Sequence, residues 1–196
     1  MASDCEACEH NLLELMMASN DNFVITGKRV GLRHPCEADL VEILALNRGS
    51  TRLHRGLVSP PKTADEFKSY LEFSQREDCQ SFLISQLADD AIVGSITLSQ
   101  IFLRGFRSAY LGYYIGERYS NRGYMTEGLQ LILRFAFQTL KLHRVEANIQ
   151  PGNLPSIALV QKAGFTQEGY SKRYLKISGR WRDHERWALL VEDWKS

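Results

Sequence analysis

The sequence lacks long apolar runs and has little net charge. No stretch approaches the roughly 18 apolar residues of a membrane-spanning helix, which argues against a membrane partner. The formal net charge is +1 over 196 residues, so nucleic acid is not indicated as a direct partner. The N-terminus is acidic ahead of Leu12-Leu-Glu-Leu-Met-Met17, the reverse of a secretory signal peptide, and we therefore expect a soluble cytoplasmic protein.

Cysteine is scarce, and its spacing supports no metal centre. The four cysteines are Cys5, Cys8, Cys36 and Cys79. Cys5-x-x-Cys8, with His10 nearby, has the spacing of half a zinc site, but no second Cys pair or spaced His pair follows. We expect no metal and free thiols in a reducing compartment.

Lys and Arg are absent from the first 21 residues, which contain five acids. Subtracting that −5 from the total of +1 leaves about +6 for the rest of the chain. This excess suits an anionic ligand, although ordinary solvated surface charge is the alternative. Residues 1–22 are interpreted as an N-terminal extension, either a short amphipathic turn or disordered, and 23–196 as one domain.

Hydrophobic periodicity predicts a mixed sheet flanked by helices, an α/β (α+β) fold. Strands are expected over 23–33 (with a turn at 27–28), 81–87, 91–101, 108–115, 143–150, 169–177 and 181–191. Helices are expected over 37–47, 63–77 (with a Thr63–Glu66 capping box), from 124 onward, and from Asn153 or Ser156 to Gly164. Short links make most strand pairs antiparallel, whereas the helix before 143–150 demands one parallel pair.

The most informative stretch is Ile115–Gly128, where a strand passes through a polar turn into an amphipathic helix. The first turn of a helix presents unpaired N–H groups, and the helix dipole adds partial positive charge, which together favour phosphate. Gly123 directly precedes the helix, where backbone can approach a ligand closely. Such a turn alone is a weak signal, because ordinary strand-to-helix links look similar.

Further motifs follow the turn. They are Asn153-x-x-Ser156, Gly164-Phe165, Glu168-Gly169 and Gly179-Arg-Trp-Arg-Asp-His184. With them the chain resembles the GNAT superfamily of N-acetyltransferases, and most of all its Rim-type branch, the ribosomal-protein alanine N-acetyltransferases. The resemblance covers roughly Val24 to the C-terminus. The family's loop pattern, R/Q-x-x-G-x-G/A, falls on Ser120–Met125, and only Gly123 matches it.

This resemblance implies a GNAT-like domain with acetyl-CoA as co-substrate. Backbone N–H groups of the turn are predicted to hold the pyrophosphate, from Asn121, Arg122, Gly123, Tyr124, Met125 and Thr126. The resemblance also implies that Tyr114 and Ile115 offer backbone groups to the pantetheine arm, and that Asn153 contacts that arm. Whether the protein is a monomer or a homodimer is left open.

Two side chains are the candidates for catalysis. Glu146 shares one face of its strand with Asn148, and it is the candidate base, acting directly or through water; a solvated or ion-paired Glu is the alternative. Ser156 resembles the residue that protonates the leaving thiolate in the Rim-type branch, with a helix N-cap as the alternative. Residues 157–165 contain no Tyr that could serve as acid instead. His184 is interpreted as structural more readily than catalytic.

The resulting hypothesis is direct transfer of acetyl to a primary amine within a ternary complex. No Cys lies near the turn or Asn153–Ser156, so an acetyl-cysteine route is unsupported. The preferred acceptor is a protein N-terminal α-amine. The alternatives are a small amine, such as an amino acid, polyamine or aminoglycoside, and a non-catalytic CoA-binding module.

Overall fold

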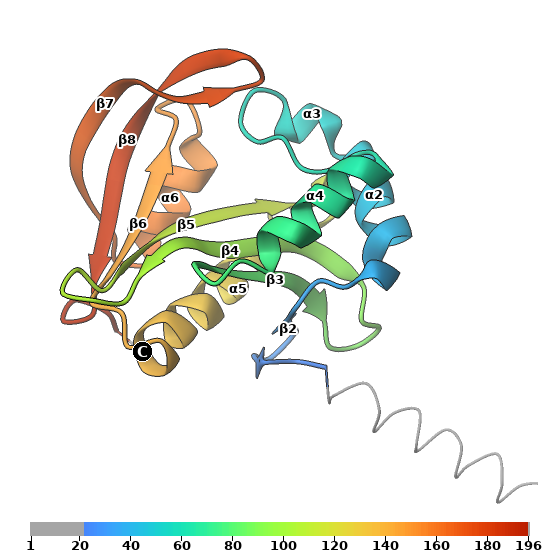
Figure 1. Ribbon diagram of the computed structural model, residues 1–196, viewed down its shortest axis with the longest axis horizontal. Helices are drawn as coiled ribbons and strands as arrows, with labels where there is room; N and C mark the ends of the chain where they lie inside the picture. Colours follow the sequence, from blue (N-terminus) through green and yellow to red (C-terminus); the bar gives the residue numbers. More distant parts are fainter. Residues whose placement is uncertain (1–21, 196) are drawn as a thin grey trace, which may run out of the picture.

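A computed structural model describes residues 22–195. Cys5, Cys8 and all but the last residue of the predicted extension therefore lie outside the described residues. The described strands are β1 (Ile25–Thr26), β2 (Val30–Arg33), β3 (Cys79–Gln86), β4 (Ile92–Phe102), β5 (Ser108–Ile115), β6 (Arg144–Ile149), β7 (Thr166–Ile177) and β8 (Arg180–Leu190). They form one sheet in the order β1-β2-β3-β4-β5-β6-β8-β7 (Figure 1).

Helices flank this sheet. They are α2 (Leu40–Gly49), preceded by the 3₁₀ turn η1 (Glu37–Asp39), then α3 (Thr51–His54), α4 (Ala64–Ser74), η2 (Glu117–Tyr119), α5 (Tyr124–Arg134), the π segment η3 (Phe135–Thr139) and α6 (Leu154–Lys162). Helix α5 contacts β2 and β4, whereas α2 contacts β4 and α4 contacts β3. The buried apolar side chains between these layers form one core.

The predicted sheet topology is confirmed. Every strand pair is antiparallel except β5 and β6, which are parallel and joined through α5. The predicted capping box of α4 is also present, since Thr63 Oγ1 accepts from Glu66 N (3.2 Å) and Glu66 Oε2 accepts from Thr63 N (3.1 Å). The capping box is a local feature, because it joins residues only three positions apart.

Some boundaries differ from the prediction. The predicted helix over 37–47 starts with a 3₁₀ turn, the helix from Thr63 ends at Ser74 rather than near 77, and the short helix α3 was not predicted. The predicted strand 23–33 is two short strands joined at Gly27–Lys28, where Gly27 N donates to Val30 O (2.8 Å). No helix within residues 22–195 has the length and apolar character needed to span a membrane.

Strands β5 and β6 pair over only three residues each, Ser108–Tyr110 with Arg144–Glu146. Beyond that point, β4 is the one partner of β5 and β8 the one partner of β6 among the described strands. Figure 1 shows β6, β7 and β8 turning away from β3, β4 and β5. The sheet therefore opens into a V, and the second half of β5 has a free backbone edge facing the opening.

Candidate active site

The strand-to-helix turn leaves the start of α5 open. Asn121 (φ 58°) and Gly123 (φ 80°) both adopt the left-handed conformation, and Gly123 is the N-cap residue of α5. Among residues 22–195, no side chain caps this helix. The N–H groups of its first turn therefore need an outside acceptor, and the helix dipole favours an anion there.

A cleft of about 490 Å³ runs from this turn to α6. Most of the predicted cofactor residues line it together with Ser156, namely Tyr114, Ile115, Asn121, Gly123, Met125, Thr126 and Asn153. Arg122, Tyr124 and Glu146 are not among the lining residues. The fold thus brings the turn, the free edge of β5 and the start of α6 to one cavity, as the predicted cofactor site requires.

His54, from the unpredicted helix α3, is a further wall of this cleft. It is 3% exposed, and burial lowers the pKa of its imidazole. Its Nε2 lies 2.8 Å from Ile115 O and must be the donor, because a carbonyl can only accept. The Ile115 carbonyl is therefore already engaged, and His54 fixes the backbone at the end of β5.

Arg29 and Glu127 brace the turn from outside the cleft. Glu127, in the first turn of α5, accepts hydrogen bonds from Lys28 N (2.6 Å), Arg29 N (2.7 Å) and Arg29 Nε (3.1 Å). Arg29 Nη1 also donates to Arg122 O (3.0 Å), and its guanidinium lies over the Tyr124 ring. These contacts connect the β1–β2 turn to Arg122 on one side of Gly123 and to Glu127 on the other.

The start of α6 separates two roles that the sequence left open. Asn153 is the N-cap residue, and its side chain accepts from Ser156 N (3.4 Å). The Ser156 hydroxyl does not cap the helix; its Oγ lies 2.5 Å from the hydroxyl of Tyr113 on β5. Ser156 is half-buried and lines the cleft, so its hydroxyl is available for chemistry.

Glu146 lies on the expected face of β6, but in an ion pair. Val145, Ala147 and Ile149 are buried on one face, while Glu146 and Asn148 lie on the other, as period two predicted. The Glu146 carboxylate accepts from Arg144 Nε at 2.7 Å. Arg144 also donates to the Glu168 carboxylate, so Glu146 has the ion-paired geometry that the sequence left as the alternative. The assignment of Glu146 as general base stays a prediction.

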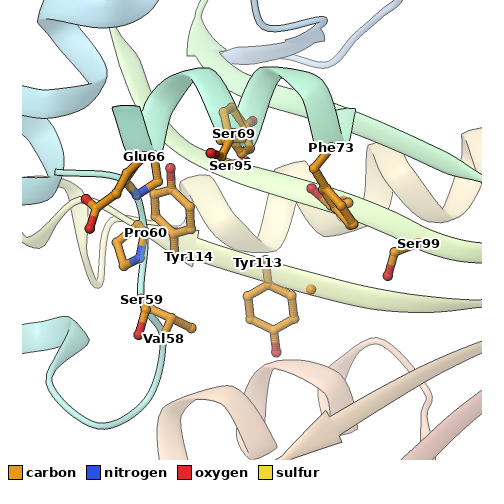
Figure 2. Close-up of a pocket in the computed structure, with 14 residues that line it drawn as sticks. Val58, Ser59, Pro60, Glu66, Ser69, Phe73, Ser95, Ser99, Tyr113 and Tyr114 are labelled. Carbon is orange, nitrogen blue, oxygen red and sulfur yellow. Dashed lines mark hydrogen bonds between the residues drawn. The ribbon is translucent and has the colours of Figure 1, made fainter. Parts of the chain in front are cut away.

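Two grooves adjoin the cleft at Tyr113 of β5, and one of them also shares Asn153 and Ser156 with it. One, of about 550 Å³, runs between α4 and the β4–β5 pair and contains Ser95, Thr97 and Ser99 (Figure 2). The second, of about 380 Å³, lies between β5, β6 and the β7–β8 hairpin; Asn148 and His184 line it. His184 is buried, which lowers the pKa of its imidazole, and its Nδ1 donates to Arg182 O (3.0 Å).

The chain matches known proteins over most of its described length. Residues 29–166 match the model of the acetyltransferase (GNAT) domain. The chain belongs to the GNAT acetyltransferase family. It is 37% identical over 124 residues to the probable N-acetyltransferase YjcK of Bacillus subtilis, a match that covers 63% of this chain and 68% of YjcK.

Two further matches fall on the Rim-type branch. Identity to the ribosomal protein uS5-alanine N-acetyltransferase of Escherichia coli is 37% over 123 residues, 63% of each chain. The structure of Mycobacterium smegmatis RimJ in complex with CoA-disulfide has a TM-score of 0.75 at 28% identity, covering 83% of this GNAT chain and 82% of that one. The predicted family and branch are confirmed, and the relatives' names agree with the predicted enzyme class, acyltransferase.

Sequence reasoning missed Tyr113, His54 and Arg29. Tyr113 stands next to the predicted Tyr114, and period two places these neighbours on opposite faces of β5. Nothing local indicates that Tyr113 meets Ser156, 43 positions away, or that Arg29 meets Glu127, 98 positions away. The sequence shows that Arg29 directly precedes β2, but it does not indicate which residue Arg29 contacts.

Proposed function

We propose that this GNAT protein is an acetyl-CoA-dependent N-acetyltransferase that acetylates the N-terminal α-amine of a protein within a ternary complex. The observation that carries the proposal is the cleft that joins the uncapped start of α5 to Ser156. On the other side of Tyr113 lie the two grooves from which an acceptor amine would arrive. Cofactor and acceptor would thus meet at one point from two directions.

The cleft fits acetyl-CoA, which when bound supplies a thioester with an electrophilic acyl carbon and a thiolate leaving group. The free N–H groups between Asn121 and Thr126 would hold its pyrophosphate. The N–H of Ile115 and the side chain of Asn153 would hold the pantetheine arm. Gly116 N donates to Val93 O, and pairs alternate along an antiparallel ladder, so the Ile115 N–H points to the open edge of β5, whereas the Tyr114 backbone faces Gly94 of β4. A hydroxyl that meets charge appearing only during reaction raises kcat rather than affinity, and Ser156 would have that role.

The lining of the acceptor grooves favours a peptide over a polyamine. Among the described residues that line them, Glu66 is the one carboxylate. Its Oε2 already accepts from Lys62 N (2.7 Å) and Thr63 N (3.1 Å). A polycation needs several carboxylates to replace its hydration, whereas the hydroxyls of Ser95 and Ser99 suit a peptide backbone.

An α-amine also suits a site whose one candidate base is a carboxylate. Its pKa is near 7.7–8.0, against about 10.4 for lysine, so neutralising it near pH 7 takes roughly 3–4 kcal/mol less. Glu146, acting directly or through water, is the proposed base for that step. Glu146→Gln should slow turnover most at low pH, where the neutral amine is scarce. A pH–rate profile that overlays wild type would remove Glu146 from the mechanism.

The test is mass spectrometry of a peptide and amine library incubated with protein and acetyl-CoA. Each peptide is paired with a copy whose N-terminus is chemically blocked but whose lysines are free, and the small amines include amino acids, spermidine and an aminoglycoside. We expect acetylation of free peptide N-termini alone. Preferential transfer to lysines or to small amines would refute the acceptor assignment.

The competing hypothesis is a CoA-binding module without catalysis. Both hypotheses predict that acetyl-CoA raises the melting temperature, because a ligand at about 100 times its Kd adds roughly 2.7 kcal/mol to the free energy of unfolding. Stabilisation without transfer to any amine in the library would favour the module. Failure of both CoA and acetyl-CoA to stabilise the protein would refute the cleft as the cofactor site.

A further inference from the structure

Tyr113 lies where all three cavities meet. It lines the cleft that runs from the start of α5 to α6 and both adjoining grooves. Figure 2 shows the rings of Tyr113 and Tyr114 pointing to opposite sides of β5. The Tyr114 hydroxyl lies near Asn47 Nδ2 (3.5 Å), whereas the Tyr113 hydroxyl reaches Ser156. Tyr113 is thus a wall shared by the proposed cofactor and acceptor sites.

Its hydroxyl forms a close pair with Ser156 Oγ, 2.5 Å away. Burial raises the pKa of Tyr113 to about 12, although the Ser156 hydrogen bond acts in the opposite direction. Tyr113 is consequently a neutral hydroxyl that can donate one proton and accept another at the same time.

We propose that Tyr113 and Ser156 form a two-hydroxyl relay that carries the proton released by the acceptor nitrogen to the departing sulfur. This inference rests on the proposed acetyl transfer and adds a route for its second proton. The first proton leaves the acceptor ammonium before attack, through Glu146 or water. The second leaves the nitrogen only as the new C–N bond forms.

The transfer balances without an outside acid. As the C–N bond forms, the C–S bond of the thioester breaks and its electron pair stays on sulfur. Tyr113 accepts the proton of the acceptor nitrogen and donates its own to Ser156 Oγ, and Ser156 donates its own to the sulfur. Both hydroxyls end neutral, and the products are an amide and a thiol.

Tyr113→Phe is the direct test, because it keeps the ring and removes the hydroxyl. We expect kcat to fall by about 10²-fold, the lower end of general acid–base effects, with little change in KM for acetyl-CoA. Ser156→Ala should fall similarly, and the double variant should be no slower than the slower single variant, because the two residues act as a unit. The control is Tyr170→Phe on the β7–β8 hairpin, which loses an exposed hydroxyl contact with Asp183 (2.7 Å) away from all three cavities.

A second readout does not depend on turnover. Hydroxyls that donate to a thiolate lower the pKa of the thiol, so CoA bound to wild type should ionise at lower pH than CoA bound to Tyr113→Phe. The ultraviolet absorption of the thiolate in a pH titration measures this, with desulfo-CoA as blank. Equal thiol pKa values in wild type, Tyr113→Phe and Tyr170→Phe would overturn the relay.

The outcomes separate the relay from the function on which it rests. If wild type acetylates no amine, the proposed function fails; if wild type is active and Tyr113→Phe matches it, only the relay fails. Should Tyr113→Phe not fold, Ser156→Thr compared with Ser156→Ala takes its place. Restored turnover and a lowered thiol pKa in the Thr variant support the relay, and a Thr variant equal to Ala counts against it.

Discussion

Glu127 reaches from the first turn of α5 to the β1–β2 turn and binds it at several atoms. Its Oε1 accepts from Lys28 N (2.6 Å), Arg29 N (2.7 Å) and Val30 N (3.3 Å), and its Oε2 accepts from Arg29 Nε (3.1 Å). A Cβ on Gly27 would lie 2.5 Å from Oε1, so the turn is shaped around this carboxylate. We predict that Glu127→Gln destabilises the protein.

The magnitude follows from the number and exposure of these contacts. A hydrogen bond to a charged group contributes about 1.5–3 kcal/mol. Water can replace the carboxylate at the exposed N–H groups, and the Arg29 side chain is 51% exposed, which discounts the ion pair. Glutamine also keeps one acceptor oxygen. A net loss of about 2–3 kcal/mol remains, or a fall in Tm of roughly 4–12 °C for a protein of this size.

The effect should depend on pH. Burial opposes ionisation of Glu127, but hydrogen bonds from Arg29 and from the neighbouring backbone N–H groups outweigh it and lower the pKa below the ordinary 4.5. A carboxyl whose folded-state pKa is lowered stabilises the folded state above the unfolded pKa, and this contribution is lost as pH falls through the folded pKa. The gap between wild type and Glu127→Gln should therefore be full at pH 7 and shrink below about 4.5.

Urea unfolding of both proteins at pH 7 and at several values below 4.5 measures this gap. Glu117→Gln is the matched control, because Glu117 pairs with Arg52, whose side chain is 89% exposed, and such surface pairs contribute about 0–1 kcal/mol. Our reasoning would be refuted if Glu127→Gln and Glu117→Gln unfolded at the same urea concentration, or if the Glu127→Gln deficit did not change with pH.

Three further predictions concern the cleft. Gly123→Ala should lower the free energy of unfolding by about 1 kcal/mol and weaken acetyl-CoA binding, because φ is 80° and the new Cβ would lie 3.1 Å from Arg29 Nη2. Urea unfolding measures the first effect and titration calorimetry the second, with Gly105→Ala as the control because no atom lies near its new Cβ. Ser156→Ala should lower kcat while the Tm changes little, because Asn153 is the cap; a fall in Tm with normal turnover would return Ser156 to a structural role. The pKa of His54 is lowered by burial, so the unfolded state takes up its proton first and stability should decline as pH drops below about 6.5; unfolding of His54→Gln should show a smaller decline over that range.

Much of this fold could be predicted from interactions between residues that are close together in the sequence. The capping box at Thr63, the alternation along β6 and the glycine before α5 are each set by residues within a few positions of one another. Their physical causes act over that same range, namely side-chain hydrogen bonds to nearby N–H groups, side-chain period and backbone sterics. The parallel pair of β5 and β6 followed as well, because a helical crossover permits little else.

The sequence by itself thus determined most of the elements, the open start of α5 and several of the residues that line the cleft between α5 and α6. Only the tertiary structure decided which groups face one another across it. The choice of Asn153 over Ser156 as cap left the Ser156 hydroxyl for Tyr113, 43 positions away. Likewise, the Glu146 carboxylate forms an ion pair with Arg144, a contact that the strand pattern alone did not predict. Such pairings depend on where a whole sheet splays and how helices pack on it, and no periodicity within one segment carries that information.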